Sequence, residues 1–295
     1  MRFGVAIDLH ATAAQAEEVA WTRVREQVLT AERAGLDLVV LPDHLAYRAG
    51  GEGDYVEEDA AVGVRESTAL TAAIAATTST IGIGHSVVNA PYRSPVMLAH
   101  VAAAIADVSG GRYSLGIGAG NSYDYDQLGV DAIRRASRFE ECVEILTGLL
   151  RDGAAHLDGE YWRADHAELT LRPDARLPVV VAAGGQRTMR IAARFGDAWN
   201  GWVPTDPDAT EARRQLQLLA ETCEVVGRDP DSIGRTVDMG VDPLDLGGVR
   251  SRSLAGLAGL RELGIDEARC YPLSHGTHGS RTEAIEAFAE LVAEL

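Results

Sequence analysis

The sequence predicts an α/β fold, a (β/α)8 TIM barrel of parallel strands, formed by a single domain over residues 1–295. Short apolar runs alternate along the chain with longer segments of helical period, and eight such units can be read. The runs are continuously apolar, as expected for parallel strands covered by helices. A doubly wound open sheet would place its glycine fingerprint in the first βα turn. That turn, "DLHATAAQ", contains no glycine, so the barrel is favoured.

The strands are expected where the apolar runs fall, with helices between them. The expected strands cover residues 2–8, 36–42, 80–88, 112–118, 177–183, 197–202, 234–241 and 267–273. The expected helices cover residues 14–34, 66–78, 94–109, 131–151, 186–195, 208–226, 248–263 and 280–294. Gly35 is typical of a helix end, and Ser94 followed by Pro95 is typical of a helix start.

Two insertions interrupt the repeating pattern. Residues 46–64 are rich in glycine and acidic residues and follow the second strand, at the barrel face where active sites lie. Either a mobile lid or a disordered connector is expected there. Residues 154–173 precede the fifth strand and predict a β-hairpin with a turn at Asp158-Gly159.

Composition excludes several classes of function. The formal net charge of −17 disfavours a nucleic-acid-binding surface. All 27 basic residues are arginines, which excludes Schiff-base chemistry on lysine and a P-loop lysine. No apolar run reaches the roughly 18 residues of a membrane span, and a signal-peptide pattern is absent. With three scattered cysteines, this predicts a cytoplasmic protein that binds neither membrane nor nucleic acid.

Glycines recur at the ends of two neighbouring strands. Gly116, Gly118 and Gly120 follow each other at alternate positions, and Gly82 and Gly84 do so on the preceding strand. The spacing fails the dinucleotide fingerprint Gly-x-Gly-x-x-Gly. Strand ends without side chains would leave a flat slot where a planar ligand can lie against the backbone. The alternative is that these glycines fill crowded layers of the barrel.

Three segments resemble the bacterial-luciferase-like superfamily, and most closely its branch of oxidoreductases that use the deazaflavin coenzyme F420. They are "AERAGLDLVVLPDHL", "IGIGHSVVNAPYRSPVMLAHVAAAIADVSGGRYSLGIGAG" and "LPVVVAAGGQRTMRIAARFGDAWNGW". The resemblance implies a flavin or deazaflavin ring in the C-terminal mouth of the barrel. It also implies hydride transfer between coenzyme F420 and a small organic substrate. Many relatives dimerise, which leaves a homodimer open.

The resemblance further implies which residues surround the ring. Asp43 and His44 match the family's Asp-His pair, in which His44 would move a proton near neutral pH with help from Asp43. Ser86 and Val87 match the position of a non-proline cis peptide bond, whose bulge supports the back of the ring. Asn89 is placed to hydrogen-bond the ring edge.

The end of the fourth strand is also expected beside the cofactor, at Gly118, Ala119, Gly120 and Asn121. Two of these residues depart from the family's patterns. Ala119 stands where the true luciferases carry an arginine for the flavin phosphate, which disfavours their mode of FMN binding. Asn121 stands where many deazaflavin enzymes carry glutamate and many flavin monooxygenases carry tryptophan.

A strand, two glycines and a helix start make an anion site in "AAGGQRTMRIAARFG". The free N–H groups and the positive end of the helix dipole face a ligand at such a turn. Gly184, Gly185 and Gln186 are expected to donate backbone N–H groups to the cofactor phosphate. Arg187 and Thr188 would add a charge and a hydroxyl group.

Three other functions remain open. The same barrel could hold FMN and act as a two-component monooxygenase, or bind a flavin without catalysis. A barrel metallohydrolase would use His-x-His after the first strand, and Asp8-Leu9-His10 is a near miss. Asp43, His44 and His85 could complete a metal cluster, but the spacing is imperfect, so no metal site is expected.

Several polar and aromatic residues have two interpretations. Trp199, Asn200 and Trp202 end the sixth strand and either line the substrate pocket or pack in the core. Arg93 and Arg112 flank the resembling segments and are interpreted as ion-pair partners that stabilise the fold.

Overall fold

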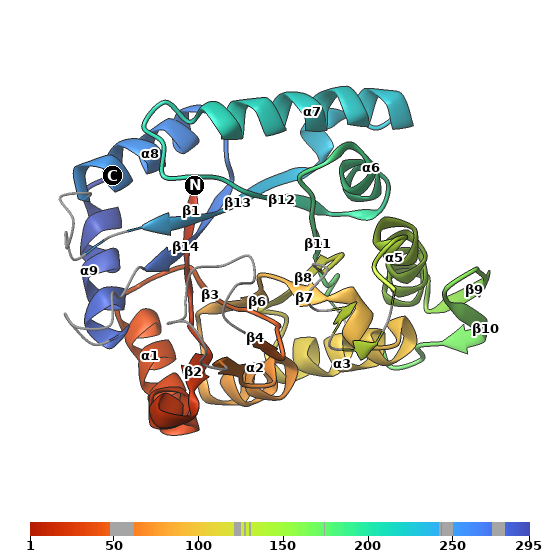
Figure 1. Ribbon diagram of the computed structural model, residues 1–295, viewed down its shortest axis with the longest axis horizontal. Coiled ribbons are helices and arrows are strands. Elements are labelled where there is room, and N and C mark those ends of the chain that lie inside the picture. The colour runs from red at the N-terminus through yellow and green to blue at the C-terminus, as the bar shows by residue number, and fades with distance from the viewer. Residues whose placement is uncertain are drawn as a thin grey trace.

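The computed structural model describes residues 1–47, 62–120, 125–126, 128–129, 131–173, 175–241, 243, 250–272 and 281–295. A closed barrel of parallel strands lies at its centre (Figure 1). In order around the barrel, the strands are β1 (Arg2–Ala6), β3 (Leu38–Leu41), β6 (Gly82–His85), β8 (Tyr113–Gly118), β11 (Val179–Ala182), β12 (Ala198–Trp202), β13 (Gly234–Val241) and β14 (Glu267–Pro272). The pairs β1–β14 and β8–β11 close the ring. The predicted α/β barrel is confirmed.

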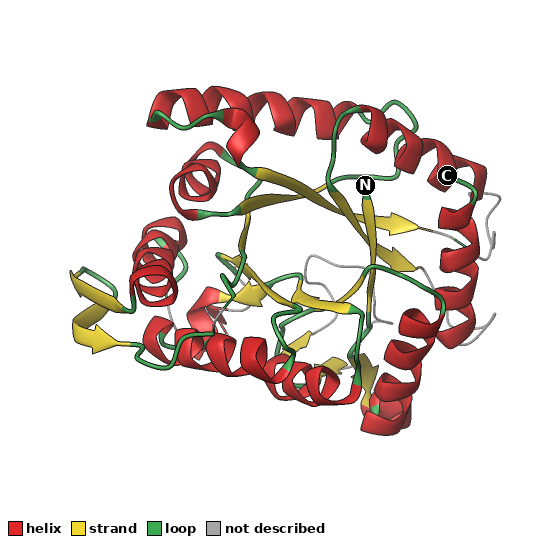
Figure 2. Ribbon diagram, turned by 180° about the vertical axis from the view of Figure 1, so that it is seen from behind, coloured by secondary structure: helices red, strands yellow, loops and turns green. Residues whose placement is uncertain are grey.

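Helices surround the strands on the outside (Figure 2). They are α1 (Trp21–Arg33), α2 (Ser67–Thr77), α3 (Pro95–Val108), α5 (Arg135–Asp152), α6 (Gln186–Phe195), α7 (Thr210–Val226), α8 (Arg250–Glu262) and α9 (Arg281–Ala293). Pro95 occupies the first turn of α3, where its missing N–H is not needed. Gly35 adopts φ +78° just after α1, a left-handed conformation that favours glycine. In the described part of the chain, no helix combines the length and apolarity needed to cross a membrane.

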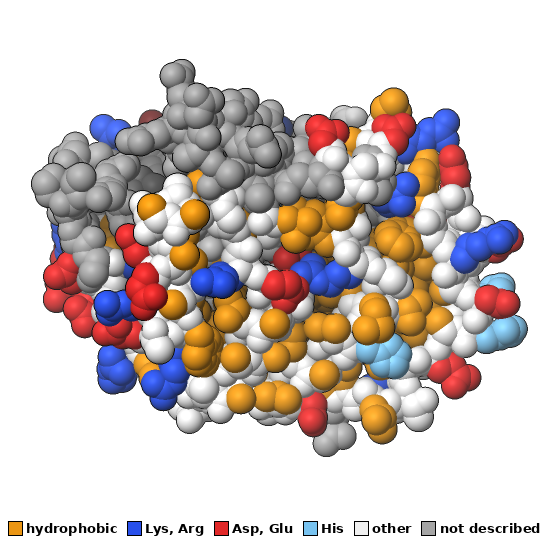
Figure 3. Space-filling view, turned by 60° about the horizontal axis from the view of Figure 1, so that its bottom comes forward, with side chains coloured by type: hydrophobic (Ala, Val, Ile, Leu, Met, Phe, Trp, Pro, Cys, Tyr) orange, Lys and Arg blue, Asp and Glu red, His pale blue; other side chains and the backbone are white. Residues whose placement is uncertain are grey.

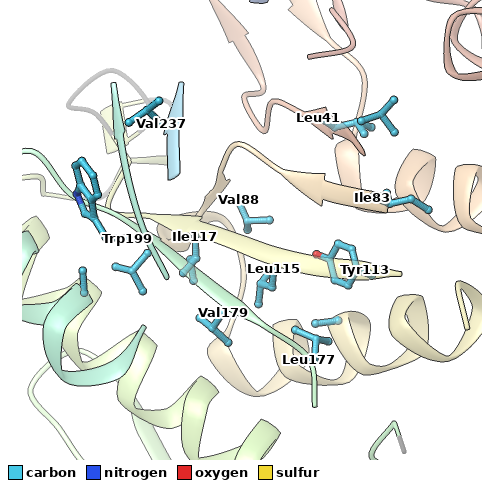
Figure 4. Packing of buried hydrophobic residues seen from close by; sticks show 14 of the residues in the cluster. Leu41, Ile83, Val88, Tyr113, Leu115, Ile117, Leu177, Val179, Trp199 and Val237 are labelled. Carbon is cyan, nitrogen blue, oxygen red and sulfur yellow. The ribbon is translucent and has the colours of Figure 1, made fainter. Parts of the chain in front are cut away.

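The two faces of each strand pack in different surroundings. Val39 and Leu41 of β3 join the large core between the strands and the helices, whereas Leu38 and Val40 point into the barrel with Ala6. Figure 4 shows part of the outer layer around β8 and β11. Because both faces are covered, the strands read as continuous apolar runs.

The barrel interior is polar on the side formed by β12, β13 and β14. On these strands, residues of the outer core alternate with residues that point into the barrel. The inward-pointing residues are Asn200, Thr236, Asp238, Glu267, Arg269 and Tyr271. Arg269 is 1% exposed, and its Nε atom donates to Glu267 at 2.7 Å. Asp238 is also buried. The closed barrel therefore carries a hydrogen-bonded polar half beside an apolar half.

Most of the strand glycines make close packing possible and do not form the expected slot. A Cβ on Gly116 would overlap the carbonyl oxygen of His85, and a Cβ on Gly84 would lie 3.0 Å from Ser114 Oγ. A Cβ on Gly82 would lie 3.0 Å from the Asp37 carbonyl oxygen. The interpretation of a side-chain-free slot is wrong at these three positions. Backbone and neighbouring side chains already occupy the space, as in the crowded-layer alternative.

Two expected elements are divided. The helix expected over residues 14–34 is a 3-10 helix, η1 (Ala13–Val19), followed by α1. Ala20 between them has an extended backbone with ψ 149°, which redirects the chain. The strand expected over residues 80–88 ends at His85 and resumes as β7 (Val88–Asn89), which also pairs with β8. A short 3-10 helix, η2 (Ala90–Tyr92), follows it.

The segment expected as a hairpin forms β9 (Ala154–Asp158) and β10 (Arg163–Glu168), which pair antiparallel. The connection is longer than a two-residue turn, because Asp158 pairs with Arg163. Glu141 of α5 closes it by accepting hydrogen bonds from three successive backbone N–H groups, at residues 160–162, over 2.8–2.9 Å. The hairpin is thereby fixed to the outer helices.

A small antiparallel sheet lies beside the barrel, which the sequence did not predict. It joins β2 (His10–Thr12), β5 (Val62–Val64) and β4 (Ala46–Tyr47). Only the two ends of the 46–64 insertion belong to the described residues, and both take part in this sheet. The insertion therefore begins and ends next to the loop after β1. The expectation of a lid or connector falls on residues outside the described part.

On the outer surface, hydrophobic side chains are interspersed with charged ones (Figure 3). Met97 and Val108 of α3 are 60% and 51% exposed. The homodimer remains a prediction.

Candidate functional site

A cavity of about 1510 Å³ opens at the carboxyl ends of the barrel strands. Every barrel strand contributes to it, from its second half or from the loop that follows. Taken in chain order, one lining residue for each strand is Asp8, His44, Ser86, Gly118, Gly184, Asn200, Asp238 and Tyr271. This is the end of a barrel where active sites lie. The volume exceeds the roughly 300–1,000 Å³ of a single small-molecule pocket, so a cofactor and a substrate can share it.

His44 follows β3 and lines the cavity, half-buried. Its Nδ1 atom lies 3.4 Å from the amide nitrogen Nδ2 of Asn89. The ring centroids of His44 and His10 are 6.2 Å apart. The structure thus places His44 and Asn89 side by side at the cavity.

Asp43 is 1% exposed and is not among the residues that line the cavity. Arg93 donates to both of its carboxylate oxygens, over 2.7 and 3.0 Å. Ser67 Oγ donates at 2.7 Å and the backbone N–H of Asn89 at 2.9 Å. Asp43 therefore fixes the segment that carries His44 and does not itself line the cavity. Arg93 is the ion-pair partner that the sequence suggested.

The peptide bond between Ser86 and Val87 is cis, as the resemblance implied. Both residues line the cavity. A Cβ on Gly118 would lie only 2.6 Å from Val87 Cγ2, so this glycine makes room for the valine side chain. The wall that a planar ligand would meet is therefore Val87 rather than bare backbone.

Gly118, Ala119 and Gly120 line the cavity at the end of β8. Gly120 adopts φ +72°, which favours glycine. Tyr125 is buried, and its hydroxyl group donates to the carbonyl oxygen of Ala119 at 3.0 Å. Asn121 lies outside the described residues.

The expected anion site forms an open cradle between β11 and α6. Gly184 and Gly185 line the cavity, and a Cβ on either would have no heavy atom within 4 Å. No described residue accepts a hydrogen bond from the N–H groups of Gly184 or Gln186. Thr188 also lines the cavity, and its Oγ1 atom lies 3.4 Å from the Gly185 nitrogen.

The sequence analysis missed one arginine near the start of α5 that lines the same cavity as this cradle. Arg187 is not among the lining residues, and its Nη2 atom donates to Ser137 of α5 at 2.7 Å. Gln186 is not among the lining residues either. Arg135, the first residue of α5, does line the cavity. No local pattern in "AIRRASR" distinguishes Arg135 from its neighbours.

The floor of the cavity holds a second missed residue, Asp238 of β13. Ser86 Oγ and Asn200 Nδ2 donate to its Oδ2 atom at 2.6 and 2.7 Å. Burial raises the pKa of Asp238 above its ordinary value, against the charge of Arg269 and these two hydrogen bonds. A carboxyl group with a raised pKa in a cavity is a candidate for proton chemistry.

The sixth strand divides between pocket and core. Asn200 and Trp202 line the cavity, and Trp202 is 54% exposed. Its ring lies 5.4 Å from that of Tyr271, between centroids. Trp199 is fully buried and donates from Nε1 to the carbonyl oxygen of Ala183 at 2.8 Å. The pocket interpretation therefore suits Asn200 and Trp202, and the core interpretation suits Trp199.

The residues of the metal-centre alternative have protein partners instead. His10 Nδ1 lies 2.6 Å from Asp8 Oδ1, and Arg281 lies 3.1 Å from Asp8 Oδ2. Burial would raise the pKa of Asp8, but the hydrogen bond from His10 and the charge of Arg281 lower it. His85 is buried, and burial lowers its pKa to about 4. Across the part of the chain that the structure describes, no three acidic, histidine or cysteine side chains gather as metal ligands.

Comparison with known proteins relates the sequence to one family. A model of the luciferase-like monooxygenase family matches residues 1–241. An F420-dependent glucose-6-phosphate dehydrogenase of Segniliparus rotundus is 29% identical over 235 residues, covering 77% of this chain and 66% of that protein. A 5,10-methylenetetrahydromethanopterin reductase of Archaeoglobus fulgidus is 34% identical over 124 residues, covering 42% and 37%.

Two solved structures share the fold along the whole chain. An F420-dependent secondary alcohol dehydrogenase, in complex with an F420-acetone adduct, superposes with a TM-score of 0.78 at 17% identity, covering 99% of this chain and 98% of that one. A monooxygenase from Streptomyces bottropensis superposes with a TM-score of 0.76 at 16% identity, covering 100% and 99%. At these identities, the likeness extends to the fold alone.

Proposed function

Because the chain belongs to the luciferase-like monooxygenase family, we propose that it is an oxidoreductase that transfers a hydride between coenzyme F420 and a small organic substrate. Relatives named for F420-dependent dehydrogenation support the choice of cofactor. The observation that carries the proposal is the grouping within one cavity of His44, the Ser86-Val87 bulge and the glycine cradle at residues 184–185. No single local motif would bring these three together.

The residues present fit a deazaflavin with a phosphate-bearing tail. The cradle is open, its N–H groups at Gly184 and Gln186 have no described partner, and Arg135 lines the same cavity. Backbone N–H groups at a helix start, with one arginine, are suited to a phosphate. Val87 and Gly118–Gly120 would hold the ring, with Asn89 at its edge. Gln186 contributes through its backbone only, and Arg187 contributes nothing directly.

When bound, F420 supplies a carbon centre that gives or takes a hydride. His44 is the residue that moves the accompanying proton, because its imidazole lines the cavity beside Asn89. Asp43 holds the segment through Arg93 and Ser67 and so fixes the imidazole. Trp202 and Tyr271 form an aromatic wall across the cavity, where an organic substrate would lie.

The cofactor is tested by titrating the purified protein with F420 and, separately, with FMN. Trp202 lines the cavity, so quenching of tryptophan fluorescence reports binding. We expect quenching by F420 at low micromolar concentration, which Trp202→Phe reduces. Tight FMN binding without F420 binding would contradict the proposal and favour the monooxygenase alternative.

Catalysis is tested by single-turnover oxidation of reduced F420 against a panel of carbonyl and enone compounds. We expect His44→Ala to slow turnover by about 10²–10⁴-fold, the range of one general acid or base, while F420 binding changes little. His156→Ala, on the hairpin away from the cavity, is the matched control. Binding without turnover on any compound would favour the non-catalytic alternative.

A further inference from the structure

The Ser86-Val87 bulge is held from the opposite side of the barrel. The Tyr271 hydroxyl group donates to the Ser86 carbonyl oxygen at 2.9 Å, and Ser86 Oγ donates to Asp238 Oδ2 at 2.6 Å. Ser86 directly follows β6, whereas Asp238 lies on β13, which stands opposite β6 in the ring of strands, and Tyr271 lies on β14. Both polar ends of Ser86 are therefore bonded to side chains that reach across the barrel.

The partners of Ser86 are fixed in turn. Asn200 Nδ2 donates to the same Asp238 oxygen at 2.7 Å. Arg269 Nη1 donates to the carbonyl oxygen of His85, the residue before Ser86, at 3.3 Å. Ser86 itself is 8% exposed, so water does not readily replace these bonds. The segment that leads into the bulge is thus held at successive polar groups.

Val87 is the part of the bulge that forms a wall of the cavity. It lines the cavity and lies against Gly118, where a Cβ would be only 2.6 Å from Val87 Cγ2. Its neighbour in the chain, Ser86, is bonded to Tyr271 and Asp238. Because the two residues are adjacent, a shift of Ser86 displaces the Val87 side chain.

We propose that the Tyr271 hydroxyl group and the Asp238 carboxyl group position Val87, through Ser86, as the wall against which the deazaflavin ring lies. The inference rests on the proposed function, because it presumes that ring in the cavity. Neither group has to touch the ring, since both act on Ser86. Tyr271 and Asp238 are therefore positioning residues for the cofactor.

The Tyr271 side chain also borders the substrate region, and the two contacts can be separated. Its ring lies 5.4 Å from that of Trp202, between centroids, while its hydroxyl group bonds to Ser86. Tyr271→Phe keeps the ring beside Trp202 and removes only the hydroxyl group. This variant therefore isolates the bond to the bulge.

Positioning is tested first without any cofactor, by NMR of the Val87 methyl groups in valine-labelled protein. We expect Tyr271→Phe to move the Val87 signals and to lower their order parameters, because the wall loses one of its supports. Tyr161→Phe, in the hairpin connection and not among the residues that line the cavity, is the matched control and should leave them unchanged. Unchanged Val87 signals in Tyr271→Phe would overturn the proposal.

The route through Ser86 is tested by combining variants and following the same signals. Asp238→Asn keeps a carbonyl oxygen that can accept from Ser86 and Asn200, so it should resemble the wild type, whereas Asp238→Ala should not. In a Ser86→Ala background, Asp238→Ala should add little, because its partner hydroxyl group is gone. Tyr271→Phe should keep its effect there, because Tyr271 bonds to the backbone. Additive effects of Ser86→Ala and Asp238→Ala would contradict this route.

The consequence for the cofactor is tested with F420 and with the same chromophore lacking its phosphate-bearing tail. A displaced wall weakens contact with the ring, so Tyr271→Phe should raise the Kd of both ligands by a similar factor, about three- to tenfold. The visible circular dichroism of the bound chromophore at saturation should also change, which a loss of stability alone would not cause. Gly184→Ala, in the cradle, should weaken F420 only.

The outcomes separate this inference from the proposed function. If the Val87 signals move in Tyr271→Phe but both Kd values stay the same, Val87 is not the wall for the ring and the proposal fails. If the wild type binds neither ligand, the proposed function fails and the assignment to the ring fails with it, while the NMR signals alone decide whether Tyr271 holds the bulge. Thermal unfolding of each variant shows whether a loss reflects misfolding.

Discussion

Arg93 and Asp43 form a two-pronged ion pair beneath the cavity wall, with N–O distances of 2.7 and 3.0 Å. The Asp43 side chain is 1% exposed and that of Arg93 is 17% exposed. Burial alone would lower the pKa of Arg93, but its bonds to Asp43 and Glu66 hold the pKa above its ordinary value. The pair joins the loop after β3 to the segment before α3, and so fixes the position of His44.

Breaking this pair should cost far more than breaking a surface pair. Arg93→Met leaves Asp43 buried without its cation, for which about 3–5 kcal/mol of unfolding free energy is typical. Arg134 and Glu160 pair at 2.9 Å with both side chains more than 60% exposed, so Arg134→Met should cost at most about 1 kcal/mol. Chemical unfolding measures both variants. Similar losses would contradict the structural role given to Asp43.

Gly118 and Val87 should behave as a coupled pair. Gly118→Ala places a methyl group 2.6 Å from Val87 Cγ2 and should destabilise by about 1–3 kcal/mol through overpacking. Adding Val87→Ala removes the obstructing atom, so the double variant should recover part of that loss. Gly116→Ala is the control, because its methyl group would meet the backbone oxygen of His85, which Val87→Ala cannot move. Strictly additive losses for Gly118 and Val87 would contradict this packing.

Arg135 rather than Arg187 should hold the cofactor phosphate. Both side chains are exposed, but only Arg135 lines the cavity, while Arg187 bonds to Ser137. We expect Arg135→Gln to raise the Kd of F420 about tenfold, as for loss of one charged hydrogen bond. The Kd of the same chromophore without its phosphate-bearing tail should not change. Arg187→Gln should leave both affinities unchanged. If Arg187→Gln weakens F420 binding and Arg135→Gln does not, Arg187 turns toward the ligand when it binds.

The sequence was sufficient to predict the barrel, because the apolar runs and helical periods that indicate its strands and helices are local patterns. The strand at 234–241 and the helix at 186–195 have the bounds that their apolar runs predicted. The break between η1 and α1 at Ala20 has no glycine or proline that would signal it, so the sequence did not predict it. The pairing of β2 with β5 joins segments about fifty residues apart, which local propensity does not encode.

The site residues that belong to a recognisable sequence motif could be predicted. Those whose surroundings depend on packing between distant segments could not. Gly184 and Gly185 signal an anion cradle in the sequence, and the structure leaves that cradle open. Gly116 also follows a strand-end glycine pattern in the sequence, but the backbone of His85 fills the space where its side chain would lie. A signal for Asp238 was present in "TVDMGV", where polar Thr236 and Asp238 alternate with apolar residues. Such alternation in a parallel strand indicates a polar barrel interior.

His85 should make the protein less stable in acid. It is buried between Thr71, 3.1 Å from Nε2, and the Tyr113 hydroxyl group, 2.8 Å from Nδ1. Burial lowers its pKa from 6.5 to about 4, against the charge of Asp43. A folded-state pKa below the unfolded value means that its contribution to stability is complete above about pH 6.5. That contribution is lost as pH falls toward 4.

Replacing His85 should therefore flatten this part of the stability profile. We expect the unfolding free energy of the wild type to fall relative to that of His85→Asn by up to about 3 kcal/mol between pH 7 and pH 4. The variant is less stable at pH 7, because the bonds to Thr71 and Tyr113 are lost. His156→Asn, exposed on β9, should track the wild type at every pH. Parallel wild-type and His85→Asn profiles from chemical unfolding would mean that His85 titrates in the folded protein as it does in the unfolded chain.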